Sequence, residues 1–197
     1  MGKMSFLREA IQTLLLALLI YLIAQANVQV FAVQRQSMEP NIHEGQRLLV
    51  NKTVYRRLDG GLARWLPFHK EGKWAYPFHP PRRGEVVVLR APGRQGEIWI
   101  KRIIGLPGDK VEMLGDRVYI NGQPLTEPYV RGTSRNLTYP VVVPKDSYFV
   151  MGDNRSYSID SSDWEGVGPI PYKNIIGKAW ISIWPPGRAP NYALAAP

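Results

Sequence analysis

The stretch Glu97-Ile98-Trp99-Ile100-Lys101-Arg102-Ile103-Ile104 decides the fold class of this chain. Five of its eight residues are β-branched or aromatic, which is typical of a strand. A second run of this kind, Glu85–Arg90 (EVVVLR), precedes it across a turn that contains proline and glycine. Further strands are predicted at residues 27–34, 46–51, 110–114, 116–120, 141–143, 147–151 and 175–183. Short strands joined by such turns predict a mainly β protein with antiparallel barrels or sheets.

The composition of the chain narrows the chemistry it can perform. The 197 residues include no cysteine, which excludes disulfides, thiolate metal sites and cysteine nucleophiles. No HExxH or similar ligand pattern predicts a metal, and we expect no cofactor. The formal net charge of +9 favours anionic partners, either phospholipid head groups or nucleic acid. Composition alone does not choose between these two.

The N-terminal region predicts a membrane anchor. Residues 10–34 carry no charged side chain, and the centre, Leu14–Ala24, is nearly all aliphatic. This length suits a transmembrane helix, which we place near residues 7–26. Lys3 and Arg8 precede it, which predicts a cytoplasmic N-terminus and an exported remainder.

The same region also fits a cleavable secretory signal that ends at Ala24-Gln25-Ala26. We predict that the anchor is retained. The expected organisation is then a cytoplasmic tip and anchor in residues 1–26, an exported β domain in 27–184 and a frayed tail in 185–197.

Residues 54–83 differ from the rest of the chain. They hold seven lysines and arginines against two acidic residues, interleaved with tryptophan, phenylalanine and tyrosine. We expect a long loop with one helical turn near Leu62–Trp65. Mixed basic and aromatic side chains suit a lipid interface, and the alternative is a solvated insertion with a local aromatic cluster.

The segment Gln36-Ser37-Met38-Glu39-Pro40 holds a candidate nucleophile. A serine hydroxyl attacks a carbonyl only when a base removes its proton. The three histidines, His43, His69 and His79, lie in turns or in the basic loop, and none has an evident orienting carboxylate.

A lysine is the other possible base, provided that an apolar setting keeps it neutral. Strand alternation places Lys101 on one face with Trp99 and Ile103, which favours burial. The competing interpretation is an edge-strand lysine that discourages aggregation.

Four sequence motifs, which follow one another along the chain, decide whether Lys101 is a base or an edge-strand lysine. They are Ser37–Pro40, Arg83–Val88, Lys101–Asp109 and Gly152–Ser161. Together with the N-terminal anchor, they resemble type I signal peptidase (leader peptidase), a Ser-Lys dyad serine endopeptidase. The resemblance implies a mostly β catalytic core with a small inserted β cap, here near residues 111–143.

The resemblance also assigns roles by position. Ser37 becomes the nucleophile, with its backbone N–H as an oxyanion donor, and Lys101 becomes the general base. Ser158 matches a serine that orients the lysine. Asp153 and Asp160 match structural carboxylates around the site. Arg102 is the expected ion-pair partner of one of them.

The chain departs from the family pattern at several positions. Arg35 stands where a serine can supply a second oxyanion donor, so that donor is unassigned. Ser162 replaces a frequent arginine, which leaves the partner of Asp160 unassigned. Asn41 replaces a common threonine, and the segment Trp164–Pro169 is two residues longer than usual.

The resemblance implies a single-pass enzyme of the plasma membrane, with its catalytic domain on the outer face. It would cleave exported preproteins after an Ala-x-Ala-like site, with the bilayer and the export translocon as further partners and no nucleic acid. One alternative is a self-cleaving repressor, against which the apolar N-terminus argues. Another is a non-catalytic anchored β module that binds anionic lipid or nucleic acid through residues 54–83.

Overall fold

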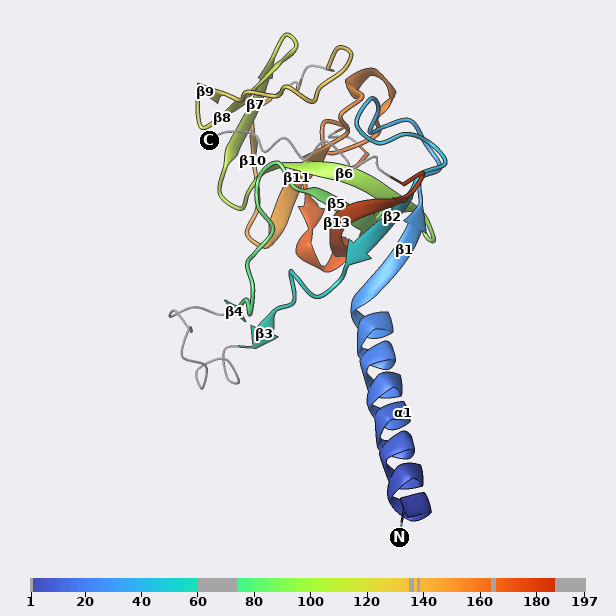
Figure 1. Cartoon of the computed structure of the whole chain (residues 1–197). Helices are drawn as coiled ribbons and strands as arrows, with labels where there is room; N and C mark the ends of the chain where they lie inside the picture. Colours follow the sequence, from blue (N-terminus) through green and yellow to red (C-terminus); the bar gives the residue numbers. More distant parts are fainter. Residues whose placement is uncertain (1, 60–73, 135–136, 138, 164–165, 187–197) are drawn as a thin grey trace.

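The computed structural model describes residues 2–59, 74–134, 137, 139–163 and 166–186. Within these ranges the chain forms one α-helix, followed by short antiparallel strands in three sheets (Figure 1). The predicted fold class, mainly β with a preceding apolar helix, is confirmed.

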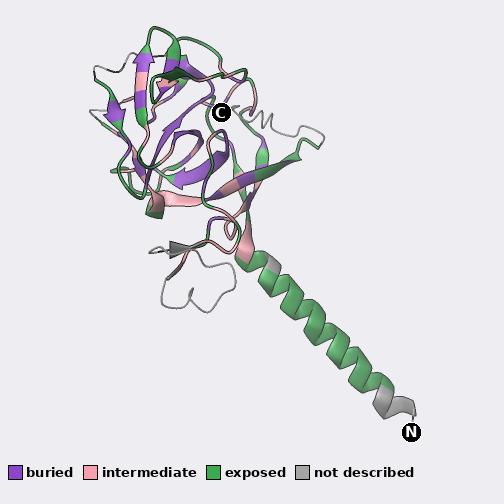
Figure 2. Ribbon diagram, turned by 90° about the vertical axis from the view of Figure 1, so that its left-hand side faces the viewer, coloured by how far each residue is buried: buried purple, intermediate pink, exposed green. Residues whose placement is uncertain are grey.

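Helix α1 (Gly2–Asn27) projects away from the β body, and its described side chains from Phe6 onward are almost all exposed (Figure 2). Its segment Phe6–Asn27 is long and apolar enough to cross a membrane. At 1.5 Å per residue it spans roughly 30 Å, the thickness of the hydrocarbon core. Among the described side chains of the helix, those of residues 14–23 are apolar and exposed on every side, as is typical of a membrane span.

The main sheet has seven strands in the order β1-β2-β13-β5-β6-β11-β12, with antiparallel neighbours. The bounds are β1 Val28–Ala32, β2 Arg47–Asn51, β5 Val86–Arg90, β6 Ile98–Gly105, β11 Ser147–Met151, β12 Ile170–Pro171 and β13 Ile175–Trp184. Strand β6 lies between β5 and β11, with Lys101 opposite Val87. The alternative of an edge-strand lysine is therefore wrong.

A second sheet has the order β10-β7-β8-β9 and is inserted between β6 and β11. Its strands are β7 Lys110–Leu114, β8 Arg117–Ile120, β9 Gln123–Pro124 and β10 Val141–Val142. Asn121 and Gly122 join β8 to β9 with φ values of 53° and 81°. Two consecutive positive φ values are typical of a two-residue hairpin turn, for which an Asn-Gly pair is a strong sequence signal.

The smallest sheet pairs β3 (Leu58–Asp59) with β4 (Trp74–Ala75). These two-residue strands lie within residues 54–83, which we expected to be a loop, so that expectation is wrong at residues 58–59 and 74–75. The predicted helical turn at Leu62–Trp65 lies outside the described residues, as does the tail from 187 onward.

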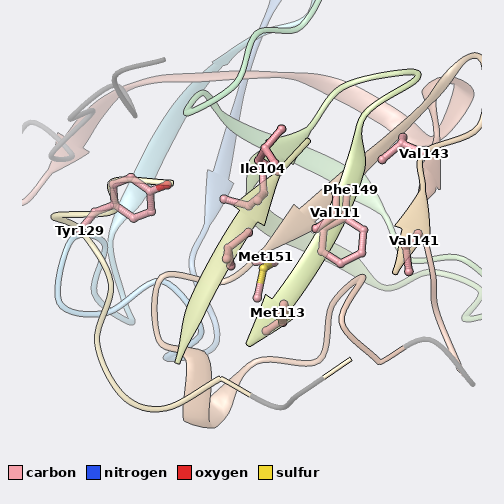
Figure 3. Packing of buried hydrophobic residues seen from close by; sticks show 10 residues of the cluster. Ile104, Val111, Met113, Tyr129, Val141, Val143, Phe149 and Met151 are labelled. Atoms are coloured by element: carbon pink, nitrogen blue, oxygen red, sulfur yellow. The ribbon is translucent and has the colours of Figure 1, made fainter. Parts of the chain in front are cut away.

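Three buried clusters hold the sheets together. The first fills the space between the inserted sheet and the ends of β6 and β11, where Ile104, Val111, Phe149 and Met151 pack (Figure 3). The second lies against one face of the main sheet and includes Trp99 and Ile103. The third includes Met38, Ile42, Leu48, Val86 and Val88, and it fixes the segment that follows Ser37.

Candidate active site

Ser37 lies in the segment between β1 and β2, and its neighbours fix its position. Met38 and Ile42 are 1% and 0% exposed, so the chain after the serine is anchored in the core. On the other side, the backbone N–H of Asn154 donates to the carbonyl of Ser37 at 3.0 Å. The side-chain amide of Asn154 donates to the carbonyl of Gln36 at 3.1 Å. The serine is therefore held between the core and the segment that begins at Gly152.

Lys101 lies in the middle of β6 and is only 3% exposed. Its Nζ donates to Oγ of Ser158 at 3.0 Å and lies 5.7 Å from the centre of the Trp99 ring. Burial lowers the pKa of Lys101 to about 8; the carboxylates of Asp160 and Asp153 oppose this shift, and the nearby charge of Arg35 contributes to it. The neutral fraction of this amine is therefore minor at pH 7 and becomes substantial at mildly alkaline pH.

Ser158 connects Lys101 to a buried carboxylate. Its hydroxyl donates to Oδ2 of Asp160, which also accepts the Gly152 N–H at 2.8 Å. The other oxygen, Oδ1, accepts the backbone N–H of Ser162 at 3.1 Å and its hydroxyl at 2.7 Å. Asp160 thus has four donors and needs no arginine, since Ser162 supplies the contacts that the sequence left unassigned.

Arg102, the next residue on β6, points to the other side of the strand and is fully buried. Its Nε and Nη2 donate to the two carboxylate oxygens of Asp153 at 2.8 and 2.6 Å, and Nη1 donates to the carbonyl of Gly84 at 2.8 Å. The side-chain amide of Asn41 donates to Asp153 at 2.9 Å. This bidentate pair ties β6 to the segment that also carries Asn154.

Gly152 lies next to both the backbone of Ser37 and the side chain of Ser158. A Cβ atom at this position would meet both the Ser37 carbonyl oxygen and the Ser158 hydroxyl at 2.4 Å. Any side chain would therefore push the two serines apart. The glycine allows the Lys101–Ser158 pair to lie next to the backbone of the candidate nucleophile.

A cavity of about 420 Å³ opens where these parts meet, and both Ser37 and Lys101 line it. Most of its other wall residues are apolar; many of these come from β1 and from the start of β6, and Met38 and Ile159 lie beside Ser37 and Ser158 in the sequence. The structure thus brings Ser37, Lys101 and Ser158 together. It places Arg102 and Asp153 behind β6, away from the cavity wall.

The histidines take no part in this arrangement as far as the structure describes them. His43 lies 4.0 Å from Glu39, and His79 lies 4.0 Å from Glu85; neither lines the cavity. His69 lies outside the described residues. Within the described part of the chain, no group of three or more His, Asp or Glu side chains could hold a metal ion.

Sequence reasoning missed four residues that shape the site, namely Asn41, Gly152, Asn154 and Ser162. Gly152 and Asn154 belong to a motif that the sequence singled out, and a glycine before an Asp-Asn pair signals a close backbone approach. The hydrogen bonds of Asn41 join it to segments that are distant in the sequence, and the hydrogen bonds of Ser162 depend on the geometry of a turn. No local sequence pattern predicts either kind of contact.

Comparison with known proteins gives the class of protein. The family model described as signal peptidase, peptidase S26, matches residues 7–184. The chain is 38% identical over 163 residues to a signal peptidase I of Leptolyngbya laminosa, covering 79% of this chain and 68% of that protein. It is 34% identical over 197 residues to signal peptidase I P of Bacillus subtilis subsp. natto, covering 94% of each.

A solved signal peptidase I from Enterococcus faecalis V583 is 32% identical, covers 51% of this chain and 97% of its own, and superposes with a TM-score of 0.42. From the family model and the sequence relatives, the chain belongs to the signal peptidase family S26. The resemblance found in the sequence is confirmed.

Proposed function

We propose that this protein is a membrane-anchored serine endopeptidase that removes N-terminal signal peptides from exported preproteins after an Ala-x-Ala-like site. Family membership supports a peptidase that acts on signal peptides. The observation that carries the mechanism is the buried Lys101 amine, which is hydrogen-bonded to a neutral hydroxyl and faces the same cavity as Ser37.

The reaction follows from the proton affinity of Lys101. Its neutral amine takes the Ser37 proton as Oγ attacks the scissile carbonyl carbon, and the backbone N–H of Ser37 donates to the oxyanion. The resulting ammonium gives its proton to the leaving amine, so the peptide bond breaks and an ester to Ser37 remains. Lys101 then takes a proton from water, whose oxygen attacks the ester carbonyl carbon. The bond to Ser37 Oγ breaks, the signal peptide leaves with a free carboxyl group, and the Lys101 ammonium returns its proton to Oγ.

The surrounding polar groups hold the base and the nucleophile in place. Ser158 accepts from the Lys101 amine and so directs its lone pair, while Asp160 fixes the Ser158 hydroxyl. The pair of Arg102 and Asp153 is a structural support behind β6. It anchors the segment whose Asn154 holds the carbonyl of Ser37.

The anchor places this site near the bilayer. Helix α1 ends at Asn27, β1 begins at Val28, and Ser37 follows β1 by five residues. With Lys3 and Arg8 on the cytoplasmic side, the domain of residues 27–184 lies on the outer face of the plasma membrane. Retention of the anchor is tested by sequencing the N-terminus in the membrane fraction, where a mature start at Asn27 would refute it.

The catalytic assignment is tested with Ser37→Ala and Lys101→Ala in the full-length protein in lipid vesicles, using an Ala-x-Ala preprotein. We expect both variants to lose cleavage, because each lacks one member of the pair that makes the nucleophile. Lys145→Ala, an exposed lysine outside the cavity, is the matched control and should cleave normally. Full activity of either Ser37→Ala or Lys101→Ala would refute the dyad.

A further inference from the structure

Two formal charges stand at the rim of the cavity that holds Ser37 and Lys101. Arg35 lies two residues before Ser37, and Glu97 directly precedes β6. Nη2 of Arg35 lies 3.9 Å from Oε2 of Glu97, so an ion pair joins the two wall segments. Among the described residues that line the cavity, these two and Lys101 are the only Lys, Arg, Asp or Glu side chains.

The two charges are unequally compensated. Glu97 also accepts from Nε1 of Trp99 at 3.0 Å and lies 4.0 Å from Nη1 of Arg94. Arg35 has no other ion-pair partner within the described ranges, and its side chain is 64% exposed against 36% for Glu97. The rim therefore presents an excess of positive charge to an entering substrate.

The position of the substrate side chain that meets this rim follows from the geometry of an extended peptide. Successive side chains of an extended chain point in opposite directions. If the small first and third residues before the cut point into the cavity, the middle residue points outward to the rim.

We infer that Arg35 and Glu97 read the charge of this middle residue, the x of Ala-x-Ala, and that Arg35 makes the enzyme prefer an acidic side chain there. The inference rests on the proposed function, which supplies the cleavage site. Asp or Glu at x would share the guanidinium with Glu97, whereas Lys or Arg would be repelled by it. An exposed ion pair of this kind is worth about a two- to fivefold difference in rate.

The test measures kcat/KM for three preproteins that differ only at x, which is Glu, Gln or Lys. In the wild-type protein in neutral-lipid vesicles at low salt, we expect Glu to be cleaved about two- to fivefold faster than Lys, with Gln between them. Arg35→Gln should abolish the ranking, because Arg94 and Trp99 compensate the Glu97 charge that remains. Glu97→Gln should enlarge the preference for Glu, and high salt should compress every ratio.

Each ratio compares substrates within one variant, so a general loss of activity in Arg35→Gln cancels. Arg35→Lys keeps the charge and should keep the ranking even if Arg35→Gln is too weak to measure. Arg117→Gln and Glu44→Gln, exposed residues away from the cavity, should leave the ratios unchanged.

Equal rates for Glu and Lys at x in the wild type, with cleavage still dependent on Ser37, would overturn this inference alone. A ranking that survives unchanged in both Arg35→Gln and Glu97→Gln would overturn it as well. Full cleavage by Ser37→Ala would instead refute the proposed function.

Discussion

Strand β6 buries two basic residues side by side and gives them different partners. Lys101 is 3% exposed, and its amine donates to the neutral hydroxyl of Ser158 at 3.0 Å. Arg102 is 0% exposed, and its guanidinium makes two hydrogen bonds to the carboxylate of Asp153. Because neighbouring residues of a strand face opposite sides, one strand carries both environments.

The difference shows how one strand can hold a structural cation and a base. A guanidinium stays charged in proteins, and the bidentate carboxylate compensates for its lost hydration. Within the described part of the chain the Lys101 amine donates to a neutral hydroxyl and to no carboxylate, so burial lowers its pKa to about 8. Asp160 lies one hydrogen bond further away and limits the fall.

The largest expected effect is the loss of activity when Lys101 is replaced. Lys101→Met should reduce kcat/KM on an Ala-x-Ala preprotein by about 10³- to 10⁴-fold, since it removes the general base. The measurement is a cleavage assay with the full-length protein in vesicles, with Lys145→Met as the control. Activity within tenfold of the wild type would show that Lys101 does not serve as the base.

The second largest expected effect is the loss of stability when Arg102 is replaced. Arg102→Met should lower the free energy of unfolding by about 3–5 kcal/mol, because it leaves the Asp153 carboxylate buried without its cation. Urea unfolding of the full-length protein in detergent measures this, and Asp153→Asn in the same background should recover part of the loss. An unchanged midpoint would mean that the pair contributes little to the fold.

Lys101→Met should change stability in the opposite direction. A lysine whose pKa falls from 10.5 to about 8 on folding carries a cost of about 3 kcal/mol at pH 7. This cost is fully present below pH 8 and disappears as the pH rises toward 10.5, since the unfolded chain then loses its proton too. We expect a gain of about 1–3 kcal/mol at pH 7 that fades at high pH; a loss at pH 7 would contradict the account.

The smallest effect concerns the charge of Arg35. Arg35→Gln should raise the pKa of Lys101, because it removes one of the influences that lower it. The rising limb of the pH profile of kcat/KM should therefore move to higher pH, measured with a substrate that has Gln at x. Movement to lower pH would show that Arg35 acts on Lys101 by another route.

Much of the fold could be predicted from the sequence, because the long strands have strong local patterns. Residues 110–114 and 147–151 are predicted with the bounds of β7 and β11. The two-residue strands β3, β4, β9 and β12 could not be predicted, since pairing with distant segments, rather than local composition, defines them.

The candidate site likewise has residues that the sequence predicts and contacts that it does not predict. The motifs and the resemblance pointed to Ser37 and Lys101, and alternation along β6 placed Trp99 and Lys101 on one face, as their 5.7 Å separation shows. The sequence could not show that Ser162 supplies two donors to Asp160, or that Arg35 reaches Glu97. The contacts of Ser162 depend on the geometry of a turn. The contact of Arg35 with Glu97 depends on how the segment after β1 approaches the segment before β6.

The most direct test of the account is the pKa of Lys101 itself. NMR titration of ¹³Cε-labelled lysines in the full-length protein, with the Lys101 signal assigned by its loss in Lys101→Met, measures it without reference to any substrate. The account predicts a titration near pH 8 for this lysine, well below the ordinary lysine value of 10.5. A Lys101 that titrates near 10.5 would be charged throughout the working range and would contradict its role as the base that activates Ser37.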